Sequence, residues 1–258
     1  MSPARLISSR DNPLLREVAL LAESARERRK RGESFIEGAH LCAAWIARHG
    51  SPREALVAQS ALDDPEVRPI LAACDRVAVV EDALYRSVSQ MAQGLGIAFV
   101  VPTPRPVPPA RIDTDCVYLD RLQDPGNVGS ILRSAAGAGI RLVITAPHTA
   151  FAWSPKVLRA GMGAHFALTI CEGVGWEELR ARLAVPALGT RLRDAQVLHR
   201  ADLSAPACWL FGNEGEGLSF EDDAIRWVTI PQTDAVESLN VAAAAAICLF
   251  EQRRQRLG

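Results

Sequence analysis

A chain of 258 residues is long enough to fold as one large domain or as two ordinary ones. Its residues are 48% hydrophobic and 23% charged, a balance typical of a globular protein, which excludes a mainly disordered chain. The formal net charge of −1 provides no overall attraction to nucleic acid, so any RNA binding requires a local patch of positive charge.

The cysteines and histidines argue against a bound metal. The six cysteines are far apart and form no C-x-x-C pair, and the five histidines lack the spacing of metal ligands. We therefore expect a reduced, cytoplasmic protein without a metal. The N-terminus lacks the apolar core of a signal peptide, and the longest apolar run, residues 241–250, is too short to cross a bilayer. No association with a membrane is expected.

The first hundred residues alternate between helical patterns and short apolar runs. Leu14, Val18, Leu21 and Ala25 recur at helical spacing and predict one helix over residues 13–31. A second helix is predicted at residues 39–48, and strands are predicted at residues 34–36, 55–58, 76–80 and 97–101. This alternation indicates an α/β sandwich with a partly parallel sheet, which we assign to a first domain of residues 1–101.

A proline-rich segment marks the boundary between two domains. Five prolines within residues 102–109 favour an extended, semi-rigid spacer, and we place a linker at residues 102–112. The second domain, residues 113–258, has short apolar runs that predict strands at 116–119, 142–144, 166–170, 208–211 and 227–230. A last helix is predicted at residues 239–256. This pattern indicates an α/β domain with a mainly parallel sheet, and such sheets bind ligands beyond the carboxyl ends of their strands.

The first loop at a predicted strand end contains Asp124-Pro125-Gly126-Asn127, and Arg133 follows it. We predict that Asn127 is the N-cap of a helix that carries Arg133 in its second turn. A turn, a cap and a surface arginine would account for this segment without any function. Alternatively both side chains reach the strand-end cleft, where the rigid guanidinium of Arg133 can hold ribose or phosphate oxygens.

The second loop contains three glycines within residues 212–217, which allow a ligand to approach the backbone closely. It matches neither the dinucleotide fingerprint nor the P-loop, and Glu214 and Glu216 would repel a phosphate. A cofactor without phosphate and with a positive sulfonium, S-adenosylmethionine, suits this loop better.

The third segment, residues 230–242, passes from a strand end through a proline-led loop into an alanine-rich helix. Ser238 is either the N-cap of an ordinary core helix or, with Asn240, part of a reaction site. In the second case, backbone groups of Ile230 and Leu239 would line the cofactor.

Together, and in this order, the three segments resemble the motifs of the SpoU/TrmH family of RNA methyltransferases. The matching pattern is Asn127-x-Gly129-x-x-x-Arg133, Gly212-Asn213-Glu214-Gly215-x-Gly217, and Ile230-Pro231 with Ser238-Leu239-Asn240-Val241. The resemblance covers roughly residues 113–256, and the connecting segment 154–164 is also similar. Residues 9–13 and 35–38 are similar to the opening of members that carry a ribosomal-protein-like RNA-binding domain. The chain departs from the pattern at Ala136-Gly137-Ala138, where relatives often carry a larger acidic or aromatic residue.

The resemblance implies transfer of a methyl group from S-adenosylmethionine to a ribose 2′-hydroxyl of structured RNA. It also implies a homodimer and a C-terminal domain with a deep trefoil knot, although knots are rare exceptions among folds. The ribosomal-protein-like first domain favours large-subunit (23S-type) ribosomal RNA as the substrate. A transfer-RNA methyltransferase and a non-catalytic RNA-binding homologue remain alternatives. A nicotinamide-dependent oxidoreductase is disfavoured because the chain lacks G-x-G-x-x-G.

The resemblance also assigns roles to individual residues. The positions that match the family's reaction centre are Asn127, Arg133, Glu214, Ser238 and Asn240. The positions that match its cofactor site are Leu210, Phe211, Gly212, Gly217, Ile230 and Leu239. Arginine keeps its proton in proteins, so we expect Arg133 to anchor a phosphate and stabilise alkoxide charge, with the proton acceptor left open.

The basic run at residues 26–31 offers a local patch for RNA. In this interpretation Arg28, Arg29 and Arg31 contact phosphates. The alternative is that these cations only complement the dipole at the carboxyl end of the first helix.

Overall fold

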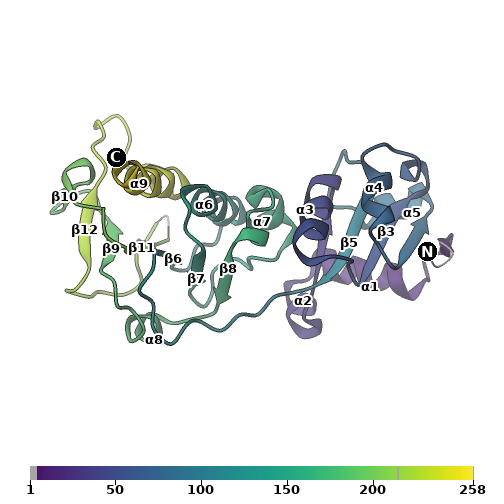
Figure 1. Ribbon diagram of the computed structural model, residues 1–258, viewed down its shortest axis with the longest axis horizontal. Helices are drawn as coiled ribbons and strands as arrows, with labels where there is room; N and C mark the ends of the chain where they lie inside the picture. Colours follow the sequence, from purple (N-terminus) through teal and green to yellow (C-terminus); the bar gives the residue numbers. More distant parts are fainter. Residues whose placement is uncertain (1–4, 214, 258) are drawn as a thin grey trace. The chain divides into compact units, whose positions relative to one another are not determined.

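The computed structural model describes residues 5–213 and 215–257 (Figure 1). The chain divides into two compact units. The described residues up to Pro104 form the first unit together with Trp153–Phe166. Arg105–Ala152 and the described residues from Ala167 onward form the second unit. Each unit has its own sheet and its own buried core, so both are α/β.

The first unit is built on a mixed five-stranded sheet with the order β1-β4-β3-β5-β2. Its strands are β1 (Arg5–Ile7), β2 (Glu33–Glu37), β3 (Glu54–Ala58), β4 (Val77–Val80) and β5 (Ile97–Pro102). Strands β1, β4 and β3 are parallel, whereas β5 pairs antiparallel with both β3 and β2. The carboxyl ends of β1 to β4 therefore meet at one edge of the sheet, where β5 begins. The predicted partly parallel sheet is confirmed.

Short helices connect these strands. They are α1 (Pro13–Glu23), α2 (Ala25–Arg31), α3 (Ala39–His49), the 3-10 turn η1 (Gln59–Ala61), α4 (Val67–Ala72) and α5 (Asp82–Val88), with α7 (Pro155–Gly161) from the later segment. The single helix predicted over residues 13–31 is wrong. Ser24 adopts extended angles (φ −108°, ψ 112°), and its hydroxyl accepts a hydrogen bond from the Glu27 N–H at 3.2 Å. Ser24 thus ends α1 and caps α2, because its short side chain competes for backbone hydrogen bonds.

The second unit contains a seven-stranded, all-parallel sheet with the order β10-β12-β9-β11-β6-β7-β8. The strands are β6 (Cys116–Leu119), β7 (Leu142–Thr145), β8 (Thr169–Glu172), β9 (Ala187–Thr190), β10 (Gln196–Val197), β11 (Cys208–Phe211) and β12 (Arg226–Thr229). The mainly parallel sheet is confirmed. The strand predicted at residues 166–170 is wrong at its start, since a 3-10 turn, η2 (Ala164–Ala167), precedes β8.

The helices of the second unit pack on the sheet and connect its strands. They are α6 (Pro125–Ala138), α8 (Trp176–Arg180), the 3-10 turn η3 (Leu198–Arg200) and α9 (Val241–Arg256). Helices α6 and α9 pack side by side (Figure 1). The indole N–H of Trp209 on β11 donates to Gln252 Oε1 at 2.9 Å and so ties α9 to the sheet. On the other face, the rings of Trp176 and Phe220 stack 4.4 Å apart over the core.

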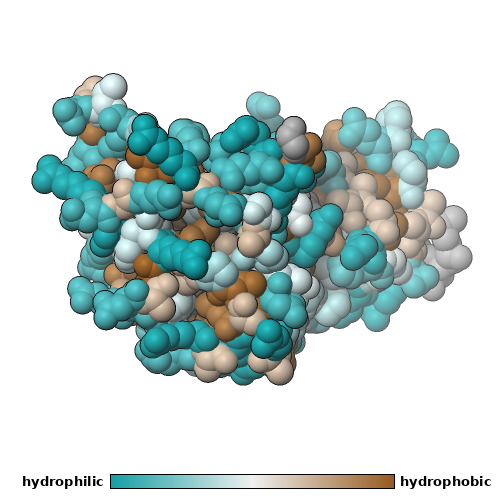
Figure 2. All heavy atoms as spheres, turned by 60° about the vertical axis from the view of Figure 1, so that its left-hand side comes forward, coloured by the Kyte–Doolittle hydropathy of each residue, from teal (hydrophilic) through white to brown (hydrophobic). Residues whose placement is uncertain are grey.

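The surface is mostly polar and the cysteine thiols are reduced, as the composition and the cysteine spacing predicted. Figure 2 shows a largely hydrophilic face on which hydrophobic side chains form small patches. All six cysteines are buried free thiols. Among the described residues, no helix is both long and apolar enough to cross a membrane.

Candidate functional site

A cavity of about 220 Å³ lies at the carboxyl edge of the second sheet. It is lined by residues at or just beyond the carboxyl ends of β9, β11 and β12 and by the first turn of α9. Of the residues predicted to hold the cofactor, five line this cavity: Leu210, Gly212, Gly217, Ile230 and Leu239. The sixth, Phe211, is 1% exposed and its ring lies parallel to that of Trp209 in the core. The position of the cavity follows the general rule for ligands of parallel sheets.

The glycine-rich loop after β11 is a tight turn that forms one wall of this cavity. The Asn213 N–H donates to the Gly217 carbonyl at 2.8 Å, and the Gly217 N–H donates back to Asn213 at 2.9 Å. A Cβ on Gly212 would lie 2.2 Å from the carbonyl carbon of Gly217, and Gly217 itself has a φ of +71°. Both positions therefore require glycine, Gly212 for close approach and Gly217 for its backbone angle.

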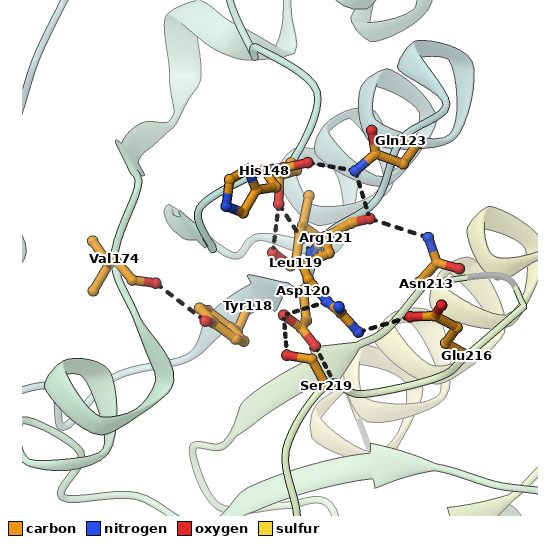
Figure 3. Close-up of polar contacts among 11 residues, drawn as sticks. Tyr118, Leu119, Asp120, Arg121, Gln123, His148, Val174, Asn213, Glu216 and Ser219 are labelled. Carbon is orange, nitrogen blue, oxygen red and sulfur yellow. Dashed lines mark hydrogen bonds and ion pairs between the residues drawn. The ribbon is translucent and has the colours of Figure 1, made fainter.

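The residues after β6 anchor this loop (Figure 3). Asp120 is 1% exposed, and its carboxylate accepts hydrogen bonds from the Ser219 N–H at 2.5 Å and from the Ser219 hydroxyl at 3.1 Å. Arg121 has a φ of +55°, and its carbonyl accepts a hydrogen bond from Asn213 Nδ2 at 3.2 Å. Its guanidinium pairs with Glu216 at 3.0 Å. The loop is thus held from both ends by the chain that leaves β6.

Sequence reasoning missed Asp120, Arg121 and Ser219 as parts of the site. One signal was available, since Asp120 directly follows the apolar run of β6 and so had to lie at the ligand-binding edge. Thr190, the last residue of β9, and Arg191 and Leu192, which follow it, also line the cavity. They were missed because β9 itself was not predicted.

Asn127 and Asn240, two of the predicted reaction-centre residues, come together in the structure. Asn240 Nδ2 donates to Asn127 Oδ1 at 2.9 Å. Asn240 is also the N-cap of α9, because its Oδ1 accepts from the N–H groups of Ala242 at 3.0 Å and Ala243 at 3.3 Å. Ser238 is therefore not the helix cap, and it lies in the cavity wall beside Leu239.

The predicted cap of α6 is also corrected. Asp124 is the N-cap, and its Oδ1 accepts from the Asn127 N–H at 2.8 Å. The helix consequently begins at Pro125, which places Arg133 in its third turn and not in its second. Arg133 is exposed, and within the described part of the chain it forms no hydrogen bond with either asparagine. Glu214, the remaining predicted reaction-centre residue, lies outside the described residues.

Two titratable side chains in the strands of this sheet, neither of which lines the cavity, are held in their neutral forms. Burial, followed by the charge of Asp120, raises the pKa of Tyr118 above its ordinary value, and its hydroxyl donates to the Val174 carbonyl at 3.1 Å (Figure 3). A hydrogen bond with Cys116 and burial raise the pKa of the Cys208 thiol. Neither side chain is therefore ready to accept a proton at neutral pH.

The residues around the cavity suit S-adenosylmethionine. Leu210, Ile230 and Leu239 provide apolar walls, while the glycine loop lets the ligand approach backbone groups. The cavity is slightly smaller than the ~300–1,000 Å³ of ordinary ligand pockets, which fits the nucleoside part of a cofactor. Neither a P-loop lysine nor a dinucleotide fingerprint is present in the sequence, so a cofactor without phosphate fits best.

The basic run in the first unit differs from its prediction. Arg28 is 3% exposed, its guanidinium donates to the carbonyls of Leu21 and Ala22, and burial lowers its pKa to about 10. The prediction that Arg28 contacts RNA is therefore wrong, because its guanidinium is used inside the unit. Arg29 and Arg31 are exposed, and Arg31 pairs with Glu27 at 3.4 Å. Their contact with RNA stays a prediction.

Comparisons with known proteins identify the family of the chain. The sequence profile of the SpoU rRNA Methylase family matches residues 115–250. An uncharacterized tRNA/rRNA methyltransferase of Synechocystis is 32% identical over 97% of this chain and 94% of that protein. The 23S rRNA (guanosine(2553)-2′-O)-methyltransferase of Bacillus subtilis is 30% identical over 88% of this chain and 91% of its own length. The crystal structure of the methyltransferase AviRb from Streptomyces viridochromogenes with bound AdoMet superposes with a TM-score of 0.86 at 26% identity, covering 95% of this chain and 98% of that chain.

Proposed function

Because the chain belongs to the SpoU rRNA Methylase family, we propose that it methylates a ribose 2′-hydroxyl of large-subunit ribosomal RNA, using S-adenosylmethionine. The observation that carries this proposal is the strand-end cavity, which gathers Leu210, Gly212, Gly217, Ile230 and Leu239 from three separate segments. The 23S rRNA activity printed for the Bacillus subtilis relative supports ribosomal RNA over transfer RNA. Cytoplasmic localisation stays a prediction.

The chemistry requires positioning more than strong acid–base catalysis. When bound, S-adenosylmethionine supplies a methyl group that is already activated by its sulfonium charge. The chain must bind the adenosine part and align the ribose oxygen with that methyl group, and alignment provides much of the acceleration. Asn127 and Asn240 bring two amide side chains together beside the cavity and can hold ribose oxygens there. Arg133 anchors the neighbouring phosphate and stabilises the developing alkoxide charge.

Replacing Arg133 with alanine tests this division of roles. We expect Arg133→Ala to abolish methyl transfer while the affinity for S-adenosylhomocysteine stays unchanged, because Arg133 is exposed on α6 and does not line the cavity. Turnover and calorimetric binding are measured on the same preparation, with Arg141→Ala as a surface control. A large loss of cofactor affinity in Arg133→Ala would contradict the assignment.

We also propose that the protein is a homodimer. Helix α9 has an exposed apolar stripe at Ala243, Ile247 and Phe250, which recur at helical spacing, and the last two are 37% and 47% exposed. Burial of such a stripe against a second copy is favourable because it removes apolar surface from water. Family members work as homodimers, and this stripe is the surface that suits the contact.

The expected trefoil knot belongs to the same proposal. Strand β12 pairs with β9, whereas α9, which follows it in the chain, packs on α6. Trp209 on β11 contacts α9 as well. The segment between β12 and α9 must therefore pass the glycine loop after β11, and both line the same cavity. That arrangement supports a chain that threads through this loop.

The first experiment is methyl transfer from labelled S-adenosylmethionine to unmodified 23S-type ribosomal RNA and, separately, to transfer RNA. We expect label in the ribosomal RNA, and a bond that resists alkaline hydrolysis at one nucleotide, since a 2′-O-methyl group blocks cleavage there. Label in transfer RNA alone would show that transfer RNA, and not ribosomal RNA, is the substrate. Cofactor binding without transfer to either RNA would favour the non-catalytic alternative.

A further inference from the structure

The first unit contains a second cavity, which the proposed chemistry does not use. Its volume is about 350 Å³. It is lined by residues that follow β2 and β3, by α5, and by the segment 89–96 that leads into β5. The carboxyl ends of β1 to β4 meet at this edge, where parallel strands of α/β sheets generally bind ligands. The cavity therefore has the position of a binding site.

A buried carboxylate fixes one wall of this cavity. Glu37, the last residue of β2, is 6% exposed. Its Oε1 accepts from the Ser89 hydroxyl at 2.5 Å, and its Oε2 accepts from the Gln90 N–H at 2.8 Å. Both oxygens are thus used to hold the start of the segment 89–96 against the sheet. This explains why an acidic residue ends the apolar run at residues 35–37.

Glycines let the same segment approach the strand ends closely. Gly96 has a φ of +65°, and a Cβ there would lie 2.7 Å from the Cβ of Ala58. Gly38 has a φ of +98°, and the sulfur of Met91 packs 3.5 Å from its Cβ position. Two residues are thus held at backbone angles that disfavour side chains, both in the wall of one cavity. The segment forms a defined pocket and not a loose surface loop.

The remaining polar groups of the wall determine which ligand fits. Asp82 Oδ1 accepts from the Ser60 N–H at 3.0 Å, and this hydrogen bond lowers the pKa of Asp82. Asp64 Oδ1 accepts from the Glu66 N–H at 2.8 Å. The Ser60 side chain also hydrogen-bonds to the Asp82 carboxylate, which keeps further lone pairs for a ligand. Asp64 accepts only through Oδ1 from the residues that the structure describes, so its Oδ2 can accept from a ligand. The guanidinium of Arg86 is the cationic donor of the wall.

This set of groups favours a base over a phosphate. Two carboxylates repel an anion, whereas they accept hydrogen bonds from N–H groups on the edge of a base. Guanine presents two adjacent N–H donors and one carbonyl acceptor on its Watson–Crick edge, whereas uracil presents a single N–H. Proteins read unpaired RNA bases through such edges, with apolar side chains against the ring. Met91 and Leu95 provide apolar surface here.

We propose that this cavity binds an unpaired guanine of the RNA substrate, with Asp64 and Asp82 accepting from its N–H groups and Arg86 donating to its carbonyl. The proposal rests on the proposed function, because it assumes an RNA substrate. It gives the first unit a means of reading sequence that does not depend on the basic run at residues 26–31.

The direct test uses guanosine and uridine as probes in saturation-transfer NMR on the full chain. Saturating S-adenosylhomocysteine is added so that neither nucleoside occupies the cofactor cavity. The double variant Asp64→Asn with Asp82→Asn keeps an oxygen for the backbone N–H groups but removes the two charges. Asp63→Asn is the matched control, because Asp63 is exposed and does not line the cavity.

We expect guanosine to bind the wild type and the control at least about fivefold more tightly than uridine, and the double variant to lose this preference. Equal signals from the two nucleosides, no guanosine signal at all, or an unchanged preference in the double variant would overturn the proposal.

A second measurement separates this proposal from the proposed function. Retention of unmodified 23S-type RNA on filters should weaken in the double variant, while affinity for S-adenosylhomocysteine should not change. If the wild type methylates this RNA and the double variant does so with the same KM, the guanine proposal fails and the methyltransferase stands. If the wild type methylates no RNA but still prefers guanosine through Asp64 and Asp82, the guanine proposal stands and the methyltransferase proposal fails.

Discussion

Replacing Gly212 with alanine should damage the cofactor cavity through a backbone clash. The added Cβ would lie 2.2 Å from the carbonyl carbon and 2.3 Å from the carbonyl oxygen of Gly217, and 2.4 Å from the Leu218 nitrogen. Ordinary van der Waals contact begins near 3.4 Å, so one side of the loop must move by more than 1 Å. The groups in the way are backbone atoms, which cannot rotate aside as a side chain can.

The cost of this movement can be estimated from the contacts it breaks. The two hydrogen bonds between Asn213 and Gly217, at 2.8 and 2.9 Å, hold the loop closed and would be lost. Each is worth ~0.5–1.5 kcal/mol net, so the closed loop becomes ~1–3 kcal/mol less stable. If the cofactor binds the closed loop, its affinity should fall by roughly 5- to 150-fold.

Calorimetric titration with S-adenosylhomocysteine measures this effect, and thermal unfolding reports whether the fold persists. Gly215→Ala is the matched control in the same loop, because its Cβ would lie 3.7 Å from Asn213 Oδ1, an ordinary contact. We expect the control to bind as the wild type does. A folded Gly212→Ala protein with an affinity within twofold of the wild type would refute the idea that this tight turn shapes the cavity.

Three further predictions follow from α9. Asn240→Ala should lower the free energy of unfolding by ~0.5–2 kcal/mol, because α9 loses its N-cap. Asn240→Asp should keep the cap but lose the donor to Asn127, so methyl transfer should fall without a matching drop in melting temperature. Hydrogen bonds from Arg254, then Gln255, lower the pKa of Glu251 from 4.5 to about 2. The charged Glu251 therefore stabilises the fold fully above pH 4.5, and this stabilisation is lost as the pH falls toward 2. Glu251→Gln should make the free energy of unfolding less dependent on pH between these two values in an acid titration. Ile247→Glu should convert the proposed dimer to a monomer in sedimentation experiments, and a monomeric wild type would contradict the dimer.

Strands that are buried on both faces could be predicted closely. The runs at residues 116–119 and 208–211 match β6 and β11 at both ends, because four apolar residues in a row suit the centre of a parallel sheet. Strand β9 was missed because Ala187-Leu188-Gly189-Thr190 contains one large apolar residue. Its glycine is required by packing, since a Cβ on Gly189 would lie 2.7 Å from the Trp227 ring.

Helix caps were predicted less well, because several residue types can cap a helix and two candidates often lie within a few residues of each other, of which only one caps the helix. Asp124 and Asn127 both have side chains that accept a backbone N–H, and the structure uses Asp124. Ser238 and Asn240 competed in the same way, and Asn240 caps α9. Ser24, inside a run that was predicted to be one helix, divides it into two.

The sequence by itself determined the order of the motifs, the residue types in each, and the class of fold, because these depend on local pattern. The tertiary structure decided which side chains meet. Asp120 and Ser219 are 99 residues apart in the chain, and Asn127 and Asn240 are 113 apart, yet both pairs form hydrogen bonds. The guanidinium of Arg28, by contrast, turned inward through local contacts, since the carbonyls of Leu21 and Ala22 that accept from it lie only seven and six residues earlier. Hydrogen bonds act over about 3 Å, and for the two distant pairs it is the parallel sheet, which collects distant strand ends at one edge, that brings the groups within this range.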